Sequence, residues 1–190
     1  WAIDLGAKYL ILTGRTQPTA DALREIQVLQ QRATLEVSSI DFTQFEEVSA
    51  LLSQPRPPLR GVVQGAGILD DGVLQEMSWQ KFQRVLAPKV TGTWNLHRAT
   101  LHCDLDFFVA FSSAAGVIGS PGQGNYAAAN VFLDTLMHFR RQLGLPATAM
   151  DWGTWATSGM AARLNEVDRD RLSRQGLEPI QPDWGLQVLE

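Results

Sequence analysis

The sequence predicts a doubly wound α/β domain, in which a parallel sheet carries helices on both faces. Short apolar runs typical of buried strands alternate with longer segments in which apolar residues recur at helical spacing. Glycine or proline punctuates most of the boundaries between these segments. In addition, 45% of the 190 residues are hydrophobic and 19% are charged, a balance that suits one globular core.

The strands and helices are expected in strict alternation. Strands are predicted over residues 8–13, 34–38, 61–64, 106–111 and 147–151. Helices are predicted over residues 18–32, 45–52, 79–101 with an interruption at Pro88, and 125–143, with a further one from Asp183. Residues 1–7 are expected to be the end of a helix that leads into the first strand. Residues 155–176 break the alternation, which is typical of a lid over a site.

Composition narrows the classes of function. The net charge of −4 gives no basic surface for nucleic acid. The single Cys103 allows no internal disulfide, and the three histidines lack zinc-ligand spacing, so we expect no metal and a reducing, cytoplasmic location. No apolar run approaches the roughly 20 residues that a membrane-spanning helix needs, so a membrane partner is not expected.

The segment FSSAAGVIGSPGQGNYAAAN, residues 111–130, is the most informative part of the chain. It follows a predicted buried strand and is rich in small residues, which allow a ligand to approach the backbone closely. Ser113 is expected at the carboxyl end of the strand. Tyr126 and Asn130 are four residues apart, so they share a face of the following helix. Taken alone, a tyrosine near a helix start is more often a core or interface residue than a catalytic one.

This segment resembles the active-site region of the short-chain dehydrogenase/reductase superfamily, whose fold is Rossmann-like. Within that superfamily it resembles the ketoreductase domains of modular polyketide synthases and related fatty acid synthases. Most superfamily members carry lysine where this chain has Asn130, whereas Lys89 stands in APKVTGTWNLH, an exchange that marks ketoreductases of multifunctional synthases. The motifs LTGR, DFT, GAGILDDGVL and DWGTWATSGMA also resemble that family and occur along the chain in the family's order. The resemblance therefore covers almost all 190 residues.

The resemblance implies roles for four catalytic residues. Tyr126 gives a proton to the alkoxide that forms when hydride reaches a ketone, and Ser113 holds its oxygen. Lys89 favours the tyrosinate by its charge and bonds the nicotinamide ribose. Asn130 supports the geometry of the site or a proton-relay water. Without the resemblance, Lys89 reads as a solvated helix residue.

The cofactor is expected to be NADPH. Arg15 follows the first predicted strand, where an arginine suits a 2′-phosphate, although it could equally be an exposed charge. By resemblance, Asp41 and Phe42 lie near the adenine, and Gly65, Ala66 and Gly67 form a loop close to the cofactor, to which Lys89 and Tyr126 also contribute. Gln64 stands where many relatives carry histidine.

A further group of residues resembles positions that govern substrate and stereochemistry. Leu69, Asp70 and Asp71 match the LDD signature of B-type ketoreductases, which set a D-configured hydroxyl, although two aspartates before a glycine also suit a simple turn. Ile118 occupies the place of the A-type tryptophan. Pro121 and Asn125 are similar to residues of some epimerising members and are common elsewhere. The remaining residues resemble the start of the lid over the acyl chain: Trp155, Gly159 and Met160.

The resemblance also implies that a first strand and a TGGxGGLG loop, which grips pyrophosphate, belong before Trp1. The chain is therefore expected to be a partial ketoreductase catalytic domain over residues 1–190, with a gap between strands 8–13 and 61–64, and to bind NADPH poorly by itself. The expected reaction is reduction of a β-ketoacyl thioester on an acyl carrier protein, supported by other domains of the same synthase. The alternatives are a non-catalytic structural reductase-like module and a free-standing or fatty-acid-type reductase.

Overall fold

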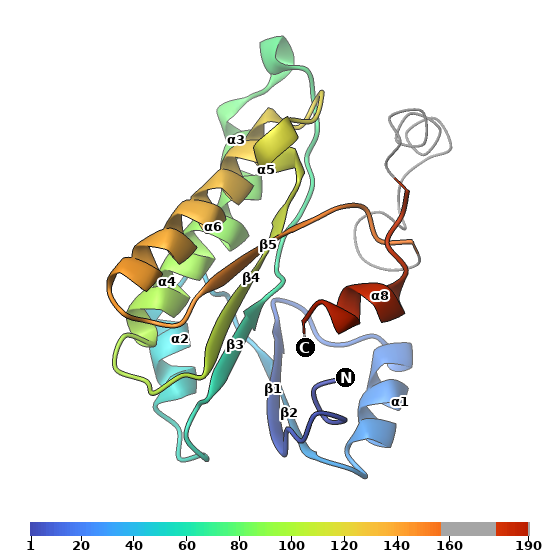
Figure 1. Ribbon diagram of the computed structural model, residues 1–190, viewed down its shortest axis with the longest axis vertical. Coiled ribbons are helices and arrows are strands. Elements are labelled where there is room, and N and C mark those ends of the chain that lie inside the picture. The colour runs from blue at the N-terminus through green and yellow to red at the C-terminus, as the bar shows by residue number, and fades with distance from the viewer. Residues whose placement is uncertain (157–177, 190) are drawn as a thin grey trace.

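The computed structural model describes residues 1–156 and 178–189, in which five strands alternate with helices (Figure 1). The strands are β1 (Tyr9–Gly14), β2 (Thr34–Ser39), β3 (Gly61–Gln64), β4 (Phe107–Ser113) and β5 (Thr148–Trp152). The helical elements are α1 (Ala20–Leu29), α2 (Phe45–Leu52), η1 (Leu74–Glu76), α3 (Trp79–Leu86), η2 (Ala87–Thr91), α4 (Gly92–Ala99), α5 (Ala115–Ile118), α6 (Gly124–Gln142) and α8 (Pro182–Gln187). Every predicted strand is confirmed with small changes at its ends.

Residues 1–7, which the sequence predicts to be the end of a helix, form a single turn of the α-helical type. Leu5 N donates to the Trp1 carbonyl over 3.0 Å, which is the bond between residues four apart that an α-helix makes. Gly6 follows with a φ of +103°, the left-handed conformation that ends a helical path and favours glycine. The chain then enters β1.

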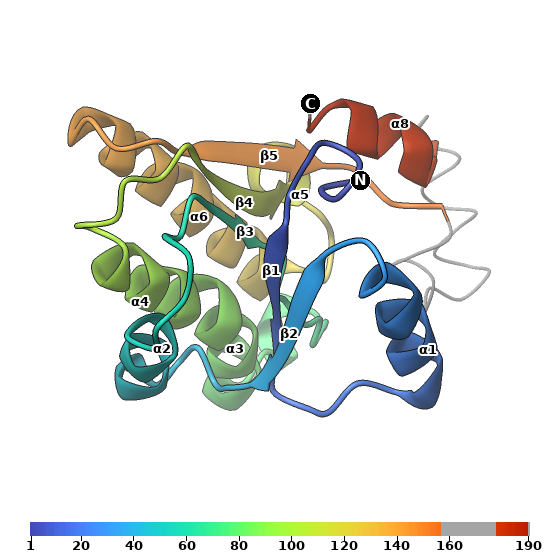
Figure 2. The same cartoon turned by 90° about the horizontal axis from the view of Figure 1, so that it is seen from below.

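The strands form two separate parallel sheets. Strands β1 and β2 pair in one sheet, and β3, β4 and β5 pair in that order in the other. Strands β1 and β3 are not hydrogen-bonded to each other, and Figure 2 shows the two sheets from below. A cavity of about 530 Å³ runs along both of them, lined by Ile11 of β1 and Val62 of β3. It lies where the resemblance implies a further central strand.

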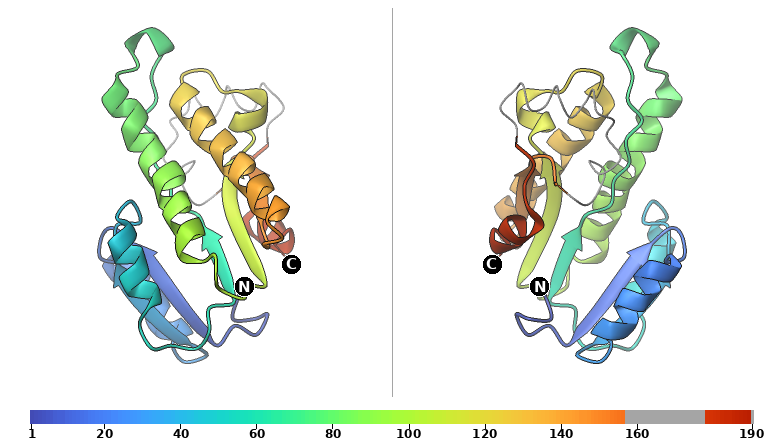
Figure 3. Two further views of the ribbon diagram at one scale, coloured as in Figure 1. Left: turned by 90° about the vertical axis from the view of Figure 1, so that its left-hand side faces the viewer. Right: turned by 90° about the vertical axis from the view of Figure 1, so that its right-hand side faces the viewer.

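Helices cover both sides, as predicted. Helices α2, α4 and α6 lie on one side, and α1 and α8 lie on the other (Figures 1 and 3). The main core forms where α2, α4 and α6 meet the β3–β5 sheet, with Val48, Phe108, Leu133 and Met137 fully buried there. None of the helices among the described residues is long and apolar enough to cross a bilayer. Burial against the sheet fixes α6, which carries Tyr126 and Asn130 of the candidate site.

Proline changes the helix that runs from Trp79 towards the core without ending it. Ser78 caps the start of α3 through its Oγ, which accepts from Lys81 N over 3.3 Å. At Pro88 the turn widens into the π-helical segment η2, and α4 continues after it. Proline lacks the N–H of a regular turn and its ring crowds the preceding carbonyl, so a wider turn accommodates it. This segment carries Lys89.

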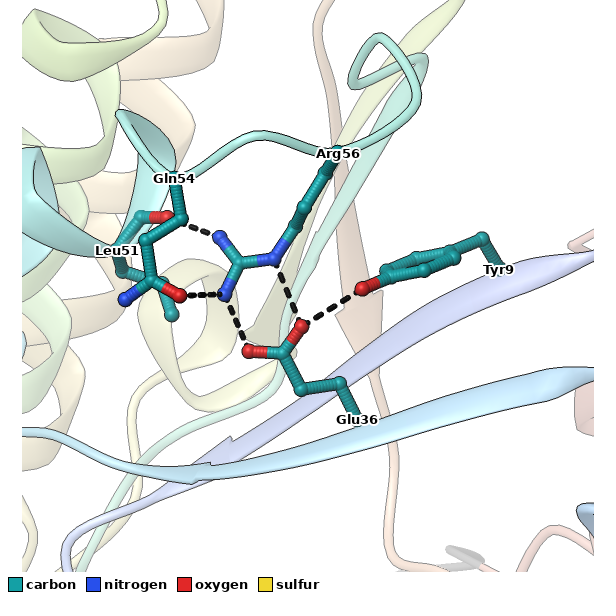
Figure 4. A network of polar contacts seen from close by, with 5 residues as sticks. All are labelled: Tyr9, Glu36, Leu51, Gln54 and Arg56. Atoms are coloured by element: carbon teal, nitrogen blue, oxygen red, sulfur yellow. Dashed lines mark hydrogen bonds and ion pairs between the residues drawn. The ribbon is translucent and has the colours of Figure 1, made fainter.

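A polar network holds the loop after α2 against the β1–β2 sheet (Figure 4). Glu36 of β2 accepts hydrogen bonds from Tyr9 Oη over 2.8 Å and from Arg56 Nε over 2.7 Å. Arg56 also donates to the Leu51 carbonyl and, over 2.8 Å, to Gln54 Oε1. The Arg56 side chain is 8% exposed and that of Glu36 is 28% exposed, so the guanidinium is largely buried while the carboxylate remains partly accessible to solvent.

Candidate active site

The strand β4 and the helix α6 bring the predicted serine, tyrosine and asparagine to one place. Strand β4 ends at Ser113, and α6 begins at Gly124, so Tyr126 lies in its first turn. Tyr126 is 8% exposed and Asn130 is fully buried. The connection turns at Gly119 and Gly122, whose φ angles of +75° and +78° favour glycine. The sequence spacing thus predicts the shared face correctly.

Lys89 reaches the same place from the π-helical segment. Its Nζ lies 5.4 Å from the centroid of the Tyr126 ring and donates to the Phe111 carbonyl of β4 over 2.8 Å. Lys89 is 2% exposed. The reading of Lys89 as a solvated helix residue is therefore wrong: the structure buries its ammonium beside the tyrosine.

Burial shifts the pKa of both groups. It lowers the pKa of Lys89 to about 8, with the charge of Asp134 acting in the opposite direction. Burial raises the pKa of Tyr126, while hydrogen bonding with Ser113 and Asn130 acts in the opposite direction. At neutral pH the lysine is therefore mostly charged and the phenol is protonated, which are the states needed for proton donation to an alkoxide.

Two polar groups beside Tyr126 keep hydrogen-bonding capacity. Ser113 Oγ accepts from Ala115 N over 3.2 Å, so its own O–H can donate to the Tyr126 hydroxyl or to an oxygen bound beside it. Asn130 Nδ2 donates to the Tyr126 carbonyl over 2.8 Å, and Ser112 Oγ donates to the Asn130 carbonyl over 3.3 Å. Asn130 Oδ1 is buried with no hydrogen-bond partner among the described residues. The site can therefore hold an oxygen and orient a further polar atom.

The cavity beside β1 and β3 gathers the residues expected to hold the cofactor. It is lined at the carboxyl ends of these strands by the following residues: Arg15, Asp41, Phe42, Gly65, Ala66 and Gly67. A Cβ on Gly67 would lie 3.0 Å from Lys89 Cε, so the glycine leaves room for the lysine beside the loop. At the carboxyl-terminal rim of this cavity, the Arg15 guanidinium and the small residues of the 65–67 loop suit the phosphates and the close approach of a nicotinamide dinucleotide.

Sequence reasoning gave Gln64 no role, and the structure places it against the loop over residues 65–67. Gln64 is 4% exposed, and its Nε2 donates to the Ala66 carbonyl over 3.0 Å and to the Pro88 carbonyl over 3.3 Å. It thereby connects the loop to the segment that carries Lys89. Its place as a polar residue at the end of a predicted strand was its only signal in the sequence.

Three of the residues expected to govern substrate lie in the loop beside the start of α6. Leu69 packs against the cluster that contains Tyr126. Asp70 forms an ion pair with Arg84, and Asp71 Oδ2 accepts from Gln123 Nε2 over 2.9 Å. The structure does not show the expected lid: Gly159 and Met160 lie outside the described residues, as does all of residues 157–176.

Three other predicted substrate residues are described. Ile118 is 66% exposed at the end of α5, and Pro121 is exposed in the following loop. Trp155 packs against Trp152, with ring centroids 4.9 Å apart, and pairs with Ile180. The structure thus places Trp155 in a packed aromatic cluster, while Ile118 and Pro121 lie at the surface. No group of three or more metal-ligating side chains occurs among the residues that the structure describes.

Comparison with known proteins agrees with this geometry. The family model of the KR domain matches residues 1–157. The chain belongs to the ketoreductase domain family. Two similar proteins are spectinabilin polyketide synthase system protein NorB of Streptomyces orinoci, 43% identical over 97% of this chain, and lovastatin diketide synthase lovF of Aspergillus terreus, 39% identical over all of it. The chain spans only 9% and 8% of their lengths.

Solved ketoreductases share the fold. A chain of an A-type ketoreductase from a modular polyketide synthase matches with a TM-score of 0.92 and 36% identity over 98% of this chain and 40% of that one. The first ketoreductase of the tylosin polyketide synthase matches with a TM-score of 0.85 and 38% identity over 96% of this chain and 40% of that one. The chain is therefore a ketoreductase domain that resembles those of polyketide synthases in sequence and shares the α/β fold of solved ketoreductases.

Proposed function

We propose that this ketoreductase domain uses NADPH to reduce a β-ketoacyl thioester, carried by an acyl carrier protein, to a D-configured β-hydroxyacyl thioester. The observation that carries the proposal is the burial of the Lys89 ammonium beside Tyr126, at the carboxyl end of β4 next to Ser113. A protonated phenol, a free hydroxyl and a fixed cation are the groups that a developing alkoxide requires.

The residues divide the chemistry among them. A nicotinamide held by these residues would be the source of the hydride that the carbonyl carbon receives. Tyr126 Oη gives its proton to the carbonyl oxygen as negative charge develops there, and Ser113 Oγ donates a hydrogen bond to the same oxygen. The Lys89 ammonium stabilises the tyrosinate that remains, and Asn130 Oδ1 is free to orient the group that returns a proton to it.

The choice of NADPH rests on Arg15. It is exposed at the end of β1 and lines the cavity together with Asp41. A guanidinium pairs well with the 2′-phosphate, whereas NADH carries a free hydroxyl at this position. We therefore expect Arg15→Ala to raise the KM for NADPH and to leave the KM for NADH little changed.

The stereochemical assignment rests on Leu69, Asp70, Asp71 and Ile118. Leu69 packs in the cluster that contains Tyr126, so the loop after it borders the reacting carbonyl. Ile118 leaves the position of the A-type tryptophan to a smaller side chain. Chiral analysis of the product of the full-length synthase chain tests this assignment, and a predominantly L-configured alcohol would contradict it.

The deciding experiment replaces Tyr126 by phenylalanine in the full-length synthase chain that carries these residues. With a β-ketoacyl thioester and NADPH, we expect kcat to fall about 10²- to 10⁴-fold, the usual contribution of a positioned general acid. The matched control is Tyr9→Phe, because Tyr9 is the other tyrosine of the chain and its hydroxyl contacts Glu36 instead. Undiminished turnover by the Tyr126 variant, followed by cofactor fluorescence, would refute the mechanism.

The isolated 190-residue chain gives a second test. Among its described residues, one edge of β1 and one edge of β3 face the cavity without a pairing strand, and no glycine-rich turn for a pyrophosphate lies between them. We expect calorimetry to detect little or no NADPH binding to this chain. Tight binding would contradict the view that a further strand and loop complete the site.

A further inference from the structure

Three hydrogen bonds join the loop over residues 69–72 to the first turn of α6 and the loop that leads into it. Gly72 N donates to the Gly122 carbonyl over 2.8 Å, and Gln123 Nε2 donates to Asp71 Oδ2 over 2.9 Å. The third bond runs from Asn125 Nδ2 to the Asp70 carbonyl over 2.9 Å. We call these three contacts the loop clamp. It connects a segment at the substrate side of the site with the helix that carries the tyrosine.

Asn125 differs from the other members because it also contacts Tyr126. Its Oδ1 accepts from Tyr126 N over 2.8 Å, so one amide group bridges the two loops and the backbone of the tyrosine. Asn125 is fully buried. Aspartate has the acceptor but no donor for the Asp70 carbonyl, and serine is too short to make both bonds.

The Asn125 side chain acts at the N-terminal turn of α6, where backbone N–H groups lack helical partners. The first N–H groups of a helix lack partners within it, and the Gln123 side chain makes no cap for α6. The Asn125 amide supplies a partner for one of these groups, the N–H of Tyr126 itself. The backbone position of Tyr126, and with it the direction of the phenol, therefore depends on the Asn125 side chain.

The other end of the bridge is held by α3. The Asp70 carboxylate pairs with Arg84 and lies 3.8 Å from Lys81 Nζ, and the same Nζ donates to the Asp71 carbonyl over 3.2 Å. The carbonyl that Asn125 contacts therefore belongs to a loop that is tied down on its far side. A displacement of this loop is transmitted to Tyr126 through one buried amide.

We propose that Asn125 is a positioning residue that fixes the place of Tyr126 relative to the 69–72 loop. The proton donor and this loop, which borders the substrate, then move together. The inference rests on the proposed reduction by Tyr126. It implies that loss of the bridge lowers kcat and the stereochemical purity of the product while the KM values change little, because the binding groups remain and only their alignment is lost.

The test compares Asn125→Asp with wild type in the full-length synthase chain. Aspartate keeps the size and the acceptor, but it places a carboxylate oxygen against the Asp70 carbonyl. We expect kcat to fall about 10²-fold, as a misplacement of about 1 Å can cause, with KM values within about threefold and a larger share of the minor alcohol. Thr135→Ala is the control, since Thr135 bonds only the Val131 carbonyl on the exposed side of α6, and it should leave all three quantities unchanged.

Asn125→Ser serves as the second variant if the aspartate variant is unstable. Its hydroxyl keeps an acceptor near Tyr126 N and cannot reach the Asp70 carbonyl, so we expect an intermediate loss of kcat and of stereochemical purity. A fall in the amount of active enzyme with an unchanged alcohol ratio would show a merely structural role and overturn the inference. If the wild-type chain reduces no β-ketoacyl thioester, the proposed function fails instead, which distinguishes the two failures.

Discussion

The Lys89 ammonium lies 5.4 Å from the centre of the Tyr126 ring, although the two side chains come from different helical segments. Lys89 is held there by the Phe111 carbonyl at 2.8 Å, and both side chains are largely buried. A buried cation next to a buried phenol is costly for folding and useful for proton transfer, so function and stability should respond to its removal in opposite directions.

The first prediction concerns Lys89→Met. Burial lowers the pKa of Lys89 to about 8 from its ordinary 10.5, which corresponds to about 3 kcal/mol of unfolding free energy lost at neutral pH. Loss of the bond to the Phe111 carbonyl offsets about 1 kcal/mol of the gain. We therefore expect the variant to unfold at higher urea concentration while its kcat falls by about 10²-fold or more.

The pH dependence of the same variant provides the check. Between pH 8 and 10.5 the unfolded wild-type chain binds more protons than the folded chain, so wild-type stability should rise with pH over this window. The contribution from Lys89 disappears in Lys89→Met. A variant that is less stable than wild type at neutral pH would show that the buried ammonium stabilises the fold.

The second prediction concerns Gly67→Ala. Its Cβ would meet Lys89 Cε at 3.0 Å, a contact that the flexible lysine can relieve by moving its amine. We expect little change in stability and a rise in the pKa of Lys89 from about 8, because the displaced amine regains contact with water.

The control for Gly67→Ala is Gly65→Ala in the same loop. There the added Cβ would lie 3.9 Å from Phe111 Cδ2, an ordinary contact, so the pKa of Lys89 should stay at about 8. The chain has only three lysines, so NMR titration of their ε-methylene groups can resolve Lys89. Equal titration curves for both variants would show that Gly67 does not set the position of the amine.

Local sequence patterns predict most strands and helices because the bounds of these elements depend on nearby apolar, glycine and proline residues. The strand over residues 61–64 is a short apolar run that ends in glycine, and the structure has it with the same bounds. At Pro88 the pattern indicates an interruption, but it does not show that the helix resumes after a π-helical turn. That outcome depends on the packing of α4 and α6 against the sheet, which a short window of sequence does not contain.

Some residues of the candidate site could likewise be predicted from local sequence, and others could not. Ser113, Tyr126 and Asn130 lie within one segment, so their spacing predicts their meeting. Lys89 lies far away in sequence, and only the resemblance to a family points to it. The bridges made by Gln64 and Asn125 join residues distant in sequence through buried amides, and neither residue type signals such a bond in advance.

The third prediction concerns His97, a buried histidine in the last turn of α4. His97 is 3% exposed, and its Nδ1 faces Arg140 Nη1 at 3.1 Å, while the Arg140 guanidinium lies 4.1 Å from the centre of the Phe108 ring. Burial, and then the charge of Arg140, lowers the pKa of His97. Below about pH 6.5 the unfolded chain therefore binds a proton that the folded chain resists, and stability should fall as the pH falls.

Urea unfolding between pH 7 and 5 measures this effect. We expect a weaker pH dependence for His97→Asn, which can face Arg140 without titrating. His102→Gln, which removes an exposed histidine, is the control and should keep the wild-type slope. A slope that survives in His97→Asn would assign the acid sensitivity to other groups.

The fourth prediction concerns the network around Glu36. The hydrogen bond from Arg56, with a further one from Tyr9, lowers the pKa of Glu36, so its contribution is present above the ordinary pKa of 4.5 and is lost as the pH falls through the folded value. We expect Glu36→Gln to speed amide hydrogen exchange in the loop from Leu51 to Arg56 at neutral pH, because the loop loses its ionic anchor to β2. Glu46→Gln removes an exposed carboxylate from α2 and should leave that exchange unchanged. If the two variants protect the loop equally, contacts other than Arg56 with Glu36 hold it against the sheet.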